Sequence, residues 1–201
     1  MIALLTFGLL AAPALADQGP WSSRLDRSVR VDTDDGAKRL ARVEYEVPVD
    51  APEEDVWALL ADYGEVHTYF PSITDSDFVG PAGLDEGTAR FCDIDFNGRQ
   101  VHVKERITEI EADRWFTYDV YETVNFPIDT MRVSFGVRTD DMGQTWVYNI
   151  IDYRLKPAMM TGFLRGSFTD SARNTVLGIK HVVEHDESLF SDELQELYPE
   201  L

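Results

Sequence analysis

Two side chains of opposite charge, Arg90 and Glu105, are the residues best placed to do chemistry together. Asn97-Gly98 lies midway between them and is typical of a two-residue turn joining antiparallel strands. Counting outward from that turn sets Arg90 opposite Glu105, on the face that also carries Cys92. Because that face is otherwise apolar, we expect it to look into the core. There, a carboxylate could act as a general base and an arginine could bind an anionic or carbonyl group.

A second turn indicates the same inward face. A two-residue turn at Ala112-Asp113 would set Glu105 opposite Val120 and would turn the same side of the next strand toward the core. The two registers agree, since both place Glu105 inside. The alternation of the later strands continues this face with Phe116, Tyr118, Met131, Val133, Phe135, Val147, Asn149, Ile151 and Tyr153.

An apolar, aromatic wall with a few convergent polar groups is typical of a small-molecule pocket. We therefore predict a ligand-binding wall, which also takes two residues from a following helix. Its members are Arg90, Glu105, Phe116, Tyr118, Val133, Phe135, Asn149, Tyr153, Leu164 and Phe168. The alternative is structural, because an inward Arg–Glu pair can be an ion pair near the sheet edge and an inward Asn can be satisfied by backbone.

The other reactive side chains are weaker candidates. Cys92 is expected to be an inert core thiol, because no His is placed to activate it. His102 faces Asp93 across the same hairpin, but on the outward face and without a nucleophile. The histidines show no metal-ligand spacing, and no phosphate loop, zinc motif or G-x-S-x-G occurs. We expect no metal and no cofactor, and the sequence does not announce an enzyme.

One long amphipathic helix at 158–184 is predicted to cover the wall. Its apolar stripe consists of Met160, Leu164, Phe168, Ala172, Val176, Ile179 and Val183. Short helices are predicted at 52–61 and 63–69. Strands are predicted at 28–33, 38–49, 73–79, 88–96, 99–111, 115–123, 130–139 and 145–155. A helix that follows a run of antiparallel strands predicts an α+β fold in which the helix covers one face of the sheet.

Glycines interrupt the predicted long helix at Gly162, Gly166 and Gly178, each costing roughly 1 kcal/mol relative to Ala. They indicate either close packing or fraying, or an N-terminal half that can move and open a space beneath the helix. Both interpretations remain open from the sequence.

The first residues predict export. Residues 1–16 are apolar, carry no charge and end in Ala14-Leu15-Ala16, the small-residue pattern of a signal cleavage site. The stretch is too short for a comfortable membrane span. We expect cleavage after Ala16 and a periplasmic or secreted protein with no stable membrane insertion. With Cys92 as its one cysteine, the chain has no internal disulfide to stabilise it.

Acidic residues dominate the remainder of the chain. The 37 Asp and Glu against 18 Lys and Arg give a formal net charge of -19, which disfavours nucleic acid and anionic membranes as partners. The sequence identifies no protein partner. We expect one domain at 39–185, preceded by a lead-in and hairpin arm at 17–38 and followed by an acidic tail at 186–201, either a short helix or free.

Four stretches carry a family resemblance. They are VPVDAPEEDVWALLADYGEVHTYFPSI at 47–73, GTARF at 87–91, VKERI at 103–107 and the closing long helix. Over roughly residues 40–184 they resemble the START-like (SRPBCC) superfamily, especially its bacterial polyketide cyclase/dehydrase-type members. The resemblance implies the helix-grip fold, a curved antiparallel sheet wrapped around a long C-terminal helix and a cavity. Related sequences often carry a Trp where this one has Asn149, which implies a more polar or roomier cavity here.

Such families mix carriers of hydrophobic molecules with a minority of aromatase/cyclases, so three functions are open. The first is an exported binding protein for a hydrophobic small molecule (lipid, isoprenoid or polyketide-like), in which Arg90 meets an anionic or carbonyl head group and Glu105 orients it. The second is a cyclase or dehydratase with Glu105 as general base, a role that pairing with Arg90 weakens. The third is an envelope protein-interaction module that uses the acidic surface or the tail.

Overall fold

The computed structural model describes residues 28–31, 38–96 and 98–201. The predicted signal segment 1–16, its cleavage site after Ala16, the lead-in from residue 17 and the turn at 34–36 all lie outside the described residues. Asn97, the first residue of the hairpin turn that set the predicted register, lies outside them too.

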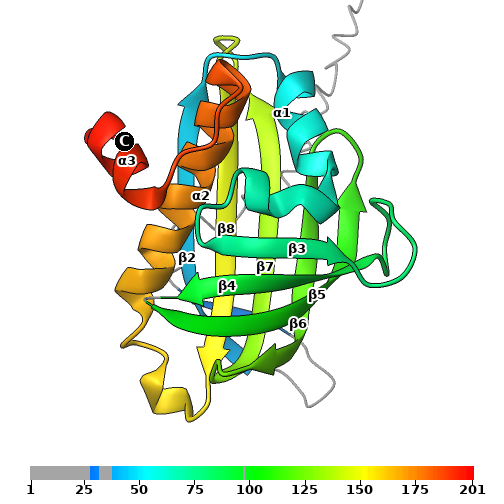
Figure 1. The fold of residues 1–201 in the computed structure, drawn as a ribbon, viewed down its shortest axis with the longest axis vertical. Helices are drawn as coiled ribbons and strands as arrows, with labels where there is room; N and C mark the ends of the chain where they lie inside the picture. The colour runs from blue at the N-terminus through cyan, green and yellow to red at the C-terminus, as the bar shows by residue number, and fades with distance from the viewer. Residues whose placement is uncertain (1–27, 32–37, 97) are drawn as a thin grey trace, which may run out of the picture.

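Within the described residues, the strands form one antiparallel sheet of eight, in the order β1-β2-β8-β7-β6-β5-β4-β3. Figure 1 shows β3, β4 and β6 running nearly across β2, β7 and β8, so the sheet bends strongly and has a concave inner face. The strand bounds are β1 Ser28–Val31, β2 Lys38–Val49, β3 Ile73–Phe78, β4 Ala89–Phe96, β5 Arg99–Glu111, β6 Trp115–Val124, β7 Ile128–Thr139 and β8 Thr145–Leu155.

The helices cover the concave face, which confirms the α+β class and the expected layers. The long helix α2 lies along one side of this face, and α1 and η2 cover its other end (Figure 1). The core between them contains Trp57 and Leu60 of α1, Phe168 and Val176 of α2, and inward residues of the sheet such as Phe116. The helix bounds are α1 Glu53–Ala61, η2 Tyr63–Thr68, η3 Ala158–Met160, α2 Arg165–His185 and α3 Ser191–Leu197.

The long helix begins later than the sequence predicts, at Arg165 instead of Ala158. Residues 158–164 are tied to the end of β8 instead. The backbone N–H of Leu155 donates to the Thr161 hydroxyl, and the Tyr153 hydroxyl donates to the Thr161 carbonyl. In a continuous helix, the Thr161 carbonyl would accept from a backbone N–H four residues later. Here it accepts from Tyr153, and the first predicted turns form η3 and a loop.

The register of β4 and β5 is the predicted one, with Arg90 opposite Glu105. The predicted pairing of Glu105 with Val120 is also confirmed, although the predicted two-residue turn before β6 is wrong. Three residues, 112–114, separate the paired Glu111 and Trp115. A register shift between Ile107 and Glu109 absorbs the extra residue, as a β-bulge does, so Glu105 and Ile107 keep their predicted partners Val120 and Tyr118.

One of the glycines in α2 marks a close packing contact. A Cβ built on Gly178 would lie 2.1 Å from the backbone carbonyl oxygen of Tyr69, whereas a Cβ on Gly166 would meet no atom within 4 Å. The absence of a side chain at Gly178 therefore lets α2 approach the end of η2 directly, which favours close packing over movement at this point of the helix.

Replacing Gly178 by Ala should therefore destabilise the protein by about 1–3 kcal/mol or more, because backbone cannot move aside as a side chain can. Gly166→Ala is the matched control and should leave stability unchanged or raise it by up to about 1 kcal/mol. Urea unfolding of both variants measures the difference. Equal stability of the two variants would contradict the close contact between α2 and η2.

Candidate ligand-binding site

The arginine at the centre of the predicted site is completely enclosed, with 0% of its surface exposed. Its Nε donates to Glu105 Oε2 at 2.7 Å, and its Nη1 donates to the carbonyl oxygen of Tyr63 at 2.7 Å. Its guanidinium also lies over two aromatic rings, 4.0 Å from the centroid of Tyr63 and 5.0 Å from that of Tyr118. Arg90 therefore joins β4 to β5 and fastens the start of η2 onto the sheet.

The charges of this cluster are fixed by burial and proximity. Burial alone would lower the pKa of Arg90, but the negative charge of Glu105 and smaller contributions from its neighbours together raise it well above the usual value. Burial, with the charge of Glu105 second, raises the pKa of the Tyr118 phenol and of the Cys92 thiol. Cys92 is fully buried and its sulfur donates to Glu105 Oε2 at 3.8 Å, which fits an inert core thiol.

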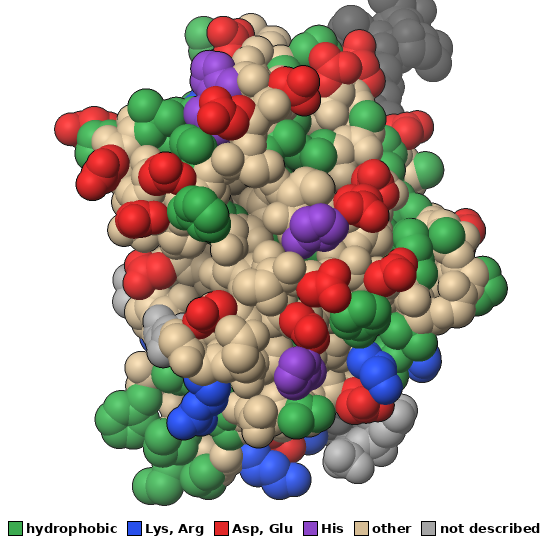
Figure 2. All heavy atoms as spheres, viewed as in Figure 1, with side chains coloured by type: hydrophobic (Ala, Val, Ile, Leu, Met, Phe, Trp, Pro, Cys, Tyr) green, Lys and Arg blue, Asp and Glu red, His purple; other side chains and the backbone are tan. Residues whose placement is uncertain are grey.

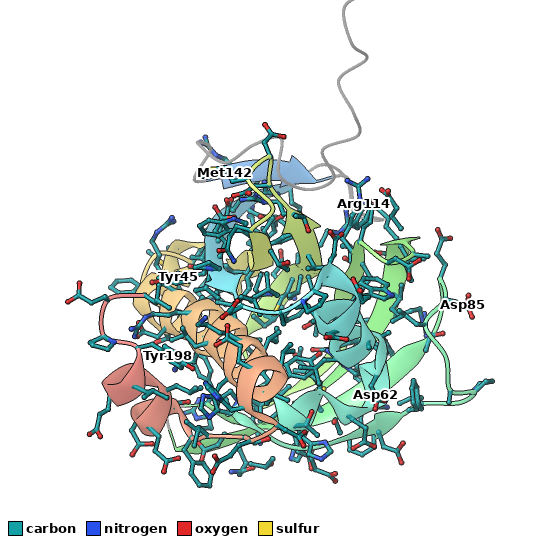
Figure 3. All side chains as sticks on the ribbon, turned by 90° about the horizontal axis from the view of Figure 1, so that it is seen from above. Tyr45, Asp62, Asp85, Arg114, Met142 and Tyr198 are labelled. Carbon is teal, nitrogen blue, oxygen red and sulfur yellow. The ribbon has the colours of Figure 1, made fainter. Side chains whose placement is uncertain are left out.

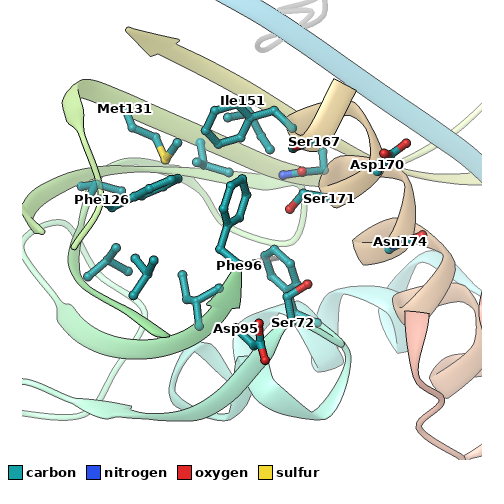
Figure 4. Close-up of a pocket in the computed structure, with 18 of the residues that line it drawn as sticks. Ser72, Asp95, Phe96, Phe126, Met131, Ile151, Ser167, Asp170, Ser171 and Asn174 are labelled. Carbon is teal, nitrogen blue, oxygen red and sulfur yellow. The ribbon is translucent and has the colours of Figure 1, made fainter. Parts of the chain in front are cut away.

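A pocket of about 380 Å³ opens beside this cluster, between the concave face of the sheet and α2. Phe96, Phe126 and Met131 point into it, and Ser167 and Ser171 face it from α2 (Figure 4). Apart from Asp95, we call its lining residues on the sheet the pocket floor: Ile94, Phe96, Val101, Val103, Glu105, Tyr118, Val120, Met131, Val133, Asn149 and Ile151.

The structure brings only part of the predicted wall to the pocket. Glu105, Tyr118, Val133 and Asn149 belong to the floor, and Phe168 lines the pocket from α2.

The rest of the predicted wall lies behind the lining or beside it. Arg90 is behind Glu105 and reaches Tyr63 instead of the pocket. Phe116 and Phe135 are both 0% exposed and pack against each other. Phe116 also packs against the rings of Trp57 and Tyr63.

The last two members of the predicted wall support the pocket from its edge. The ring of Tyr153 packs on Phe168 with 4.1 Å between centroids. Leu164 immediately precedes α2 and is partly buried against the core.

A polar rim surrounds the apolar interior, and sequence reasoning missed it. We call these polar lining residues the pocket rim: Ser72, Asp95, Ser167, Asp170, Ser171, Asn174, Ser191 and Gln195. The rim residues on α2 lie beside the apolar stripe of that helix. Their position next to the stripe is visible in the sequence and could have predicted a polar border to the pocket. Ser191 and Gln195 come from the acidic tail, whose position no local pattern predicts.

The tail is a docked helix and not a free segment. Leu194 of α3 is completely buried, and Arg173 of α2 donates to the carbonyl oxygens of Tyr198 and Leu201 at 2.8 and 2.6 Å. Figure 3 shows α3 beside α2 with Tyr198 at their junction. Since Gln195 also donates to Asn174 of the rim at 3.2 Å, the tail completes one side of the pocket mouth.

The remaining candidates stay at the surface. His102 contacts Asp93 on the outward face, with side chains 49% and 33% exposed. Among the residues with described positions, no group of three His, Cys, Asp or Glu could hold a metal ion. Nor does any helix within this part of the chain have the length and apolar character needed to cross a membrane. Acidic side chains are spread over the face that carries α2 and α3 (Figure 2).

Removing the buried cation tests its structural role. Arg90→Met should destabilise the protein by about 3–5 kcal/mol, because it leaves the carboxylate of Glu105 buried without its partner. Adding Glu105→Gln should recover part of that loss, since the uncompensated charge is gone. The exposed pair of Arg114 with Glu111 supplies the control, and Arg114→Met should cost about 0–1 kcal/mol. A small loss for Arg90→Met in chemical unfolding would contradict the anchoring role.

A buried phenol near Arg90 predicts alkaline sensitivity. Burial raises the pKa of Tyr69 from 10.0 to about 12, although the Arg90 charge opposes the shift. A raised pKa in the folded state gives stability that is complete below about pH 10 and is lost as pH rises toward 12, because the unfolded chain releases the proton first. Tyr69→Phe should flatten this decline in thermal unfolding midpoints. An identical decline in both proteins would refute the assignment.

Comparisons with known proteins agree with this architecture. The family model for polyketide cyclase / dehydrase and lipid transport matches residues 40–184. A search among curated protein sequences finds no significant match.

Solved structures share the fold at low sequence identity. The Zhui aromatase/cyclase of a Streptomyces species is 18% identical, with a TM-score of 0.61 over 72% of this chain and 94% of that one. A major latex-like protein of Panax ginseng is 18% identical, with a TM-score of 0.59 over 70% and 95%. A START superfamily protein of Mycobacterium smegmatis is 14% identical, with a TM-score of 0.58 over 71% and 97%. The chain therefore belongs to the polyketide cyclase / dehydrase and lipid transport family and has the helix-grip fold of the START-like superfamily.

Proposed function

We propose that this protein binds one hydrophobic small molecule, such as a lipid, isoprenoid or polyketide-like compound, between the sheet and α2. The observation that carries the proposal is the pocket of about 380 Å³, whose interior is apolar and aromatic with few polar groups. This volume is at the small end of the range for ligand sites, and the lining has their usual composition. The family's description includes lipid transport, which supports a carrier.

We propose further that the protein works outside the cytoplasm, as a periplasmic or secreted carrier. The support is the uncharged apolar segment 1–16, which ends in Ala14-Leu15-Ala16. A carrier in an aqueous compartment needs an apolar site for its cargo, and the pocket between the sheet and α2 supports this role.

Binding is favoured over catalysis because of how Glu105 is held. Its Oε2 accepts from Arg90 at 2.7 Å and from the Cys92 thiol at 3.8 Å, so this oxygen is already engaged. The name of the Zhui aromatase/cyclase states cyclase activity for that protein. Cyclase or dehydratase chemistry would need Glu105 to take a proton from a substrate. The same carboxylate in a carrier needs only to stay in place.

Filling the pocket should abolish uptake. Val120 lines the pocket and is only partly buried, so Val120→Trp should occupy the cavity without disrupting the core. Nile red, an uncharged dye whose fluorescence reports an apolar site, should bind the variant about tenfold more weakly or worse. Val79→Trp is the control, because Val79 is 40% exposed and lies outside the pocket lining.

Both variants should keep the unfolding temperature of the parent. Undiminished dye binding by a folded Val120→Trp protein would show that the pocket is not the binding site. Phe135 is less suitable for this test, since it is 0% exposed in the core and a polar replacement there would unfold the protein.

A further inference from the structure

The pocket floor contains a buried hydrogen-bond acceptor without a partner. Asn149 is 1% exposed, and its Nδ2 donates to the backbone carbonyl oxygen of Ser134 at 3.3 Å. A carbonyl oxygen can only accept, so the amide nitrogen must face Ser134 and the amide oxygen must face elsewhere. That oxygen, Oδ1, is itself buried and has no hydrogen-bond partner among the described residues. A buried acceptor left unpaired is costly, and a ligand that donates to it would remove the cost.

The second polar group of the floor is also an acceptor. Glu105 is 4% exposed and lines the pocket, and the cation that compensates its charge is completely buried behind it. Arg90 directs Nε to Glu105 and Nη1 to the Tyr63 carbonyl, and its Nη2 is buried without a hydrogen-bond partner among the described residues. Arg90 is not one of the residues that line the pocket. A ligand therefore meets the carboxylate of the pair and not the guanidinium.

The charges around the pocket also disfavour an anionic ligand. Three carboxylates line it, Glu105 on the floor and Asp95 and Asp170 at the rim, and no Lys, Arg or His occurs among the described lining residues. The two arginines of α2 are directed to backbone oxygens instead: Arg165 donates to the Arg42 carbonyl, and Arg173 donates to the backbone oxygens of Tyr198 and Leu201. An anionic head group would enter a negative site with no cation to receive it.

We propose that the pocket selects an uncharged amphiphile whose polar end carries a hydroxyl or another hydrogen-bond donor, and that it rejects carboxylates and phosphates. A hydroxyl has one proton to donate, and either Asn149 Oδ1 or the carboxylate of Glu105 receives it. The Tyr118 hydroxyl, which can donate or accept, belongs to the same pocket floor. This inference rests on the proposed binding function and narrows its ligand class. It also reverses the sequence-based hypothesis that Arg90 meets an anionic or carbonyl head.

Three molecules with the same number of carbon atoms separate the effects of a hydrogen-bond donor, an acceptor and a negative charge on binding. Decanol carries the donor, its isomer methyl nonyl ether can only accept, and decanoate is anionic at neutral pH. Competition against Nile red should show decanol binding at least about tenfold more tightly than either of the others. The ether should still compete weakly, since the apolar contacts remain.

Two near-isosteric variants test whether Asn149 and Glu105 cause the differences in affinity between the three molecules. Asn149→Leu should lower the ratio of decanol to ether affinity by about threefold or more while the ether binds as before or better, which a purely structural role would not produce. The ratio need not fall to one, because Glu105 remains as an acceptor. Glu105→Gln should relieve the exclusion of decanoate. Gln100→Leu is the matched control, because Gln100 is an exposed amide outside the pocket lining, and it should leave every ratio unchanged.

The possible failures are distinguishable. If decanoate or the ether competes as well as decanol in the parent protein, the donor inference is overturned and the binding function stands. An unchanged decanol-to-ether ratio in a folded Asn149→Leu protein also overturns it. If none of the three molecules competes, both the proposed binding function and this inference fail.

Discussion

The hydrogen-bonded pair of Arg90 and Glu105 is the interaction on which the arrangement of this protein depends. A guanidinium with no access to water must find partners in the interior, and here it finds the carboxylate, the Tyr63 carbonyl and two aromatic faces. These contacts place η2 over one end of the sheet. They also hold the Glu105 carboxylate at the pocket floor, so one buried cation fixes both the covering helix and the polar end of the cavity.

The pocket follows from what the helices cover and what they leave uncovered. At the end closed by α1 and η2, Trp57 and Tyr63 pack on Phe116. Farther along α2, small rim residues such as Ser167 and Ser171 face the sheet, and the cavity opens there. The result is an apolar chamber with acceptors on its floor and a polar mouth, partly formed by α3. This division suits a molecule with one long apolar part and one small uncharged polar group.

The sequence predicted the sheet registers well because period-two alternation and turn residues are local properties. The pairing of Arg90 with Glu105 needed only a turn position and counting. The sequence could not show which inward residues face empty space, since that depends on contacts with distant helices. Phe135 and Val133 share an inward face, yet only Val133 reaches the pocket. The start of α2 was also unpredictable, because the Thr161 bonds that displace it are tertiary contacts.

A crystal structure of the protein with bound decanol would show whether Glu105 and Asn149 face the ligand while Arg90 stays behind them. We expect the hydroxyl oxygen within about 3.2 Å of Asn149 Oδ1 or a Glu105 carboxylate oxygen. Arg90 should keep its bonds to Glu105 and to the Tyr63 carbonyl. A hydroxyl bonded to an Arg90 guanidinium turned into the pocket, or a ligand bound elsewhere, would contradict the account.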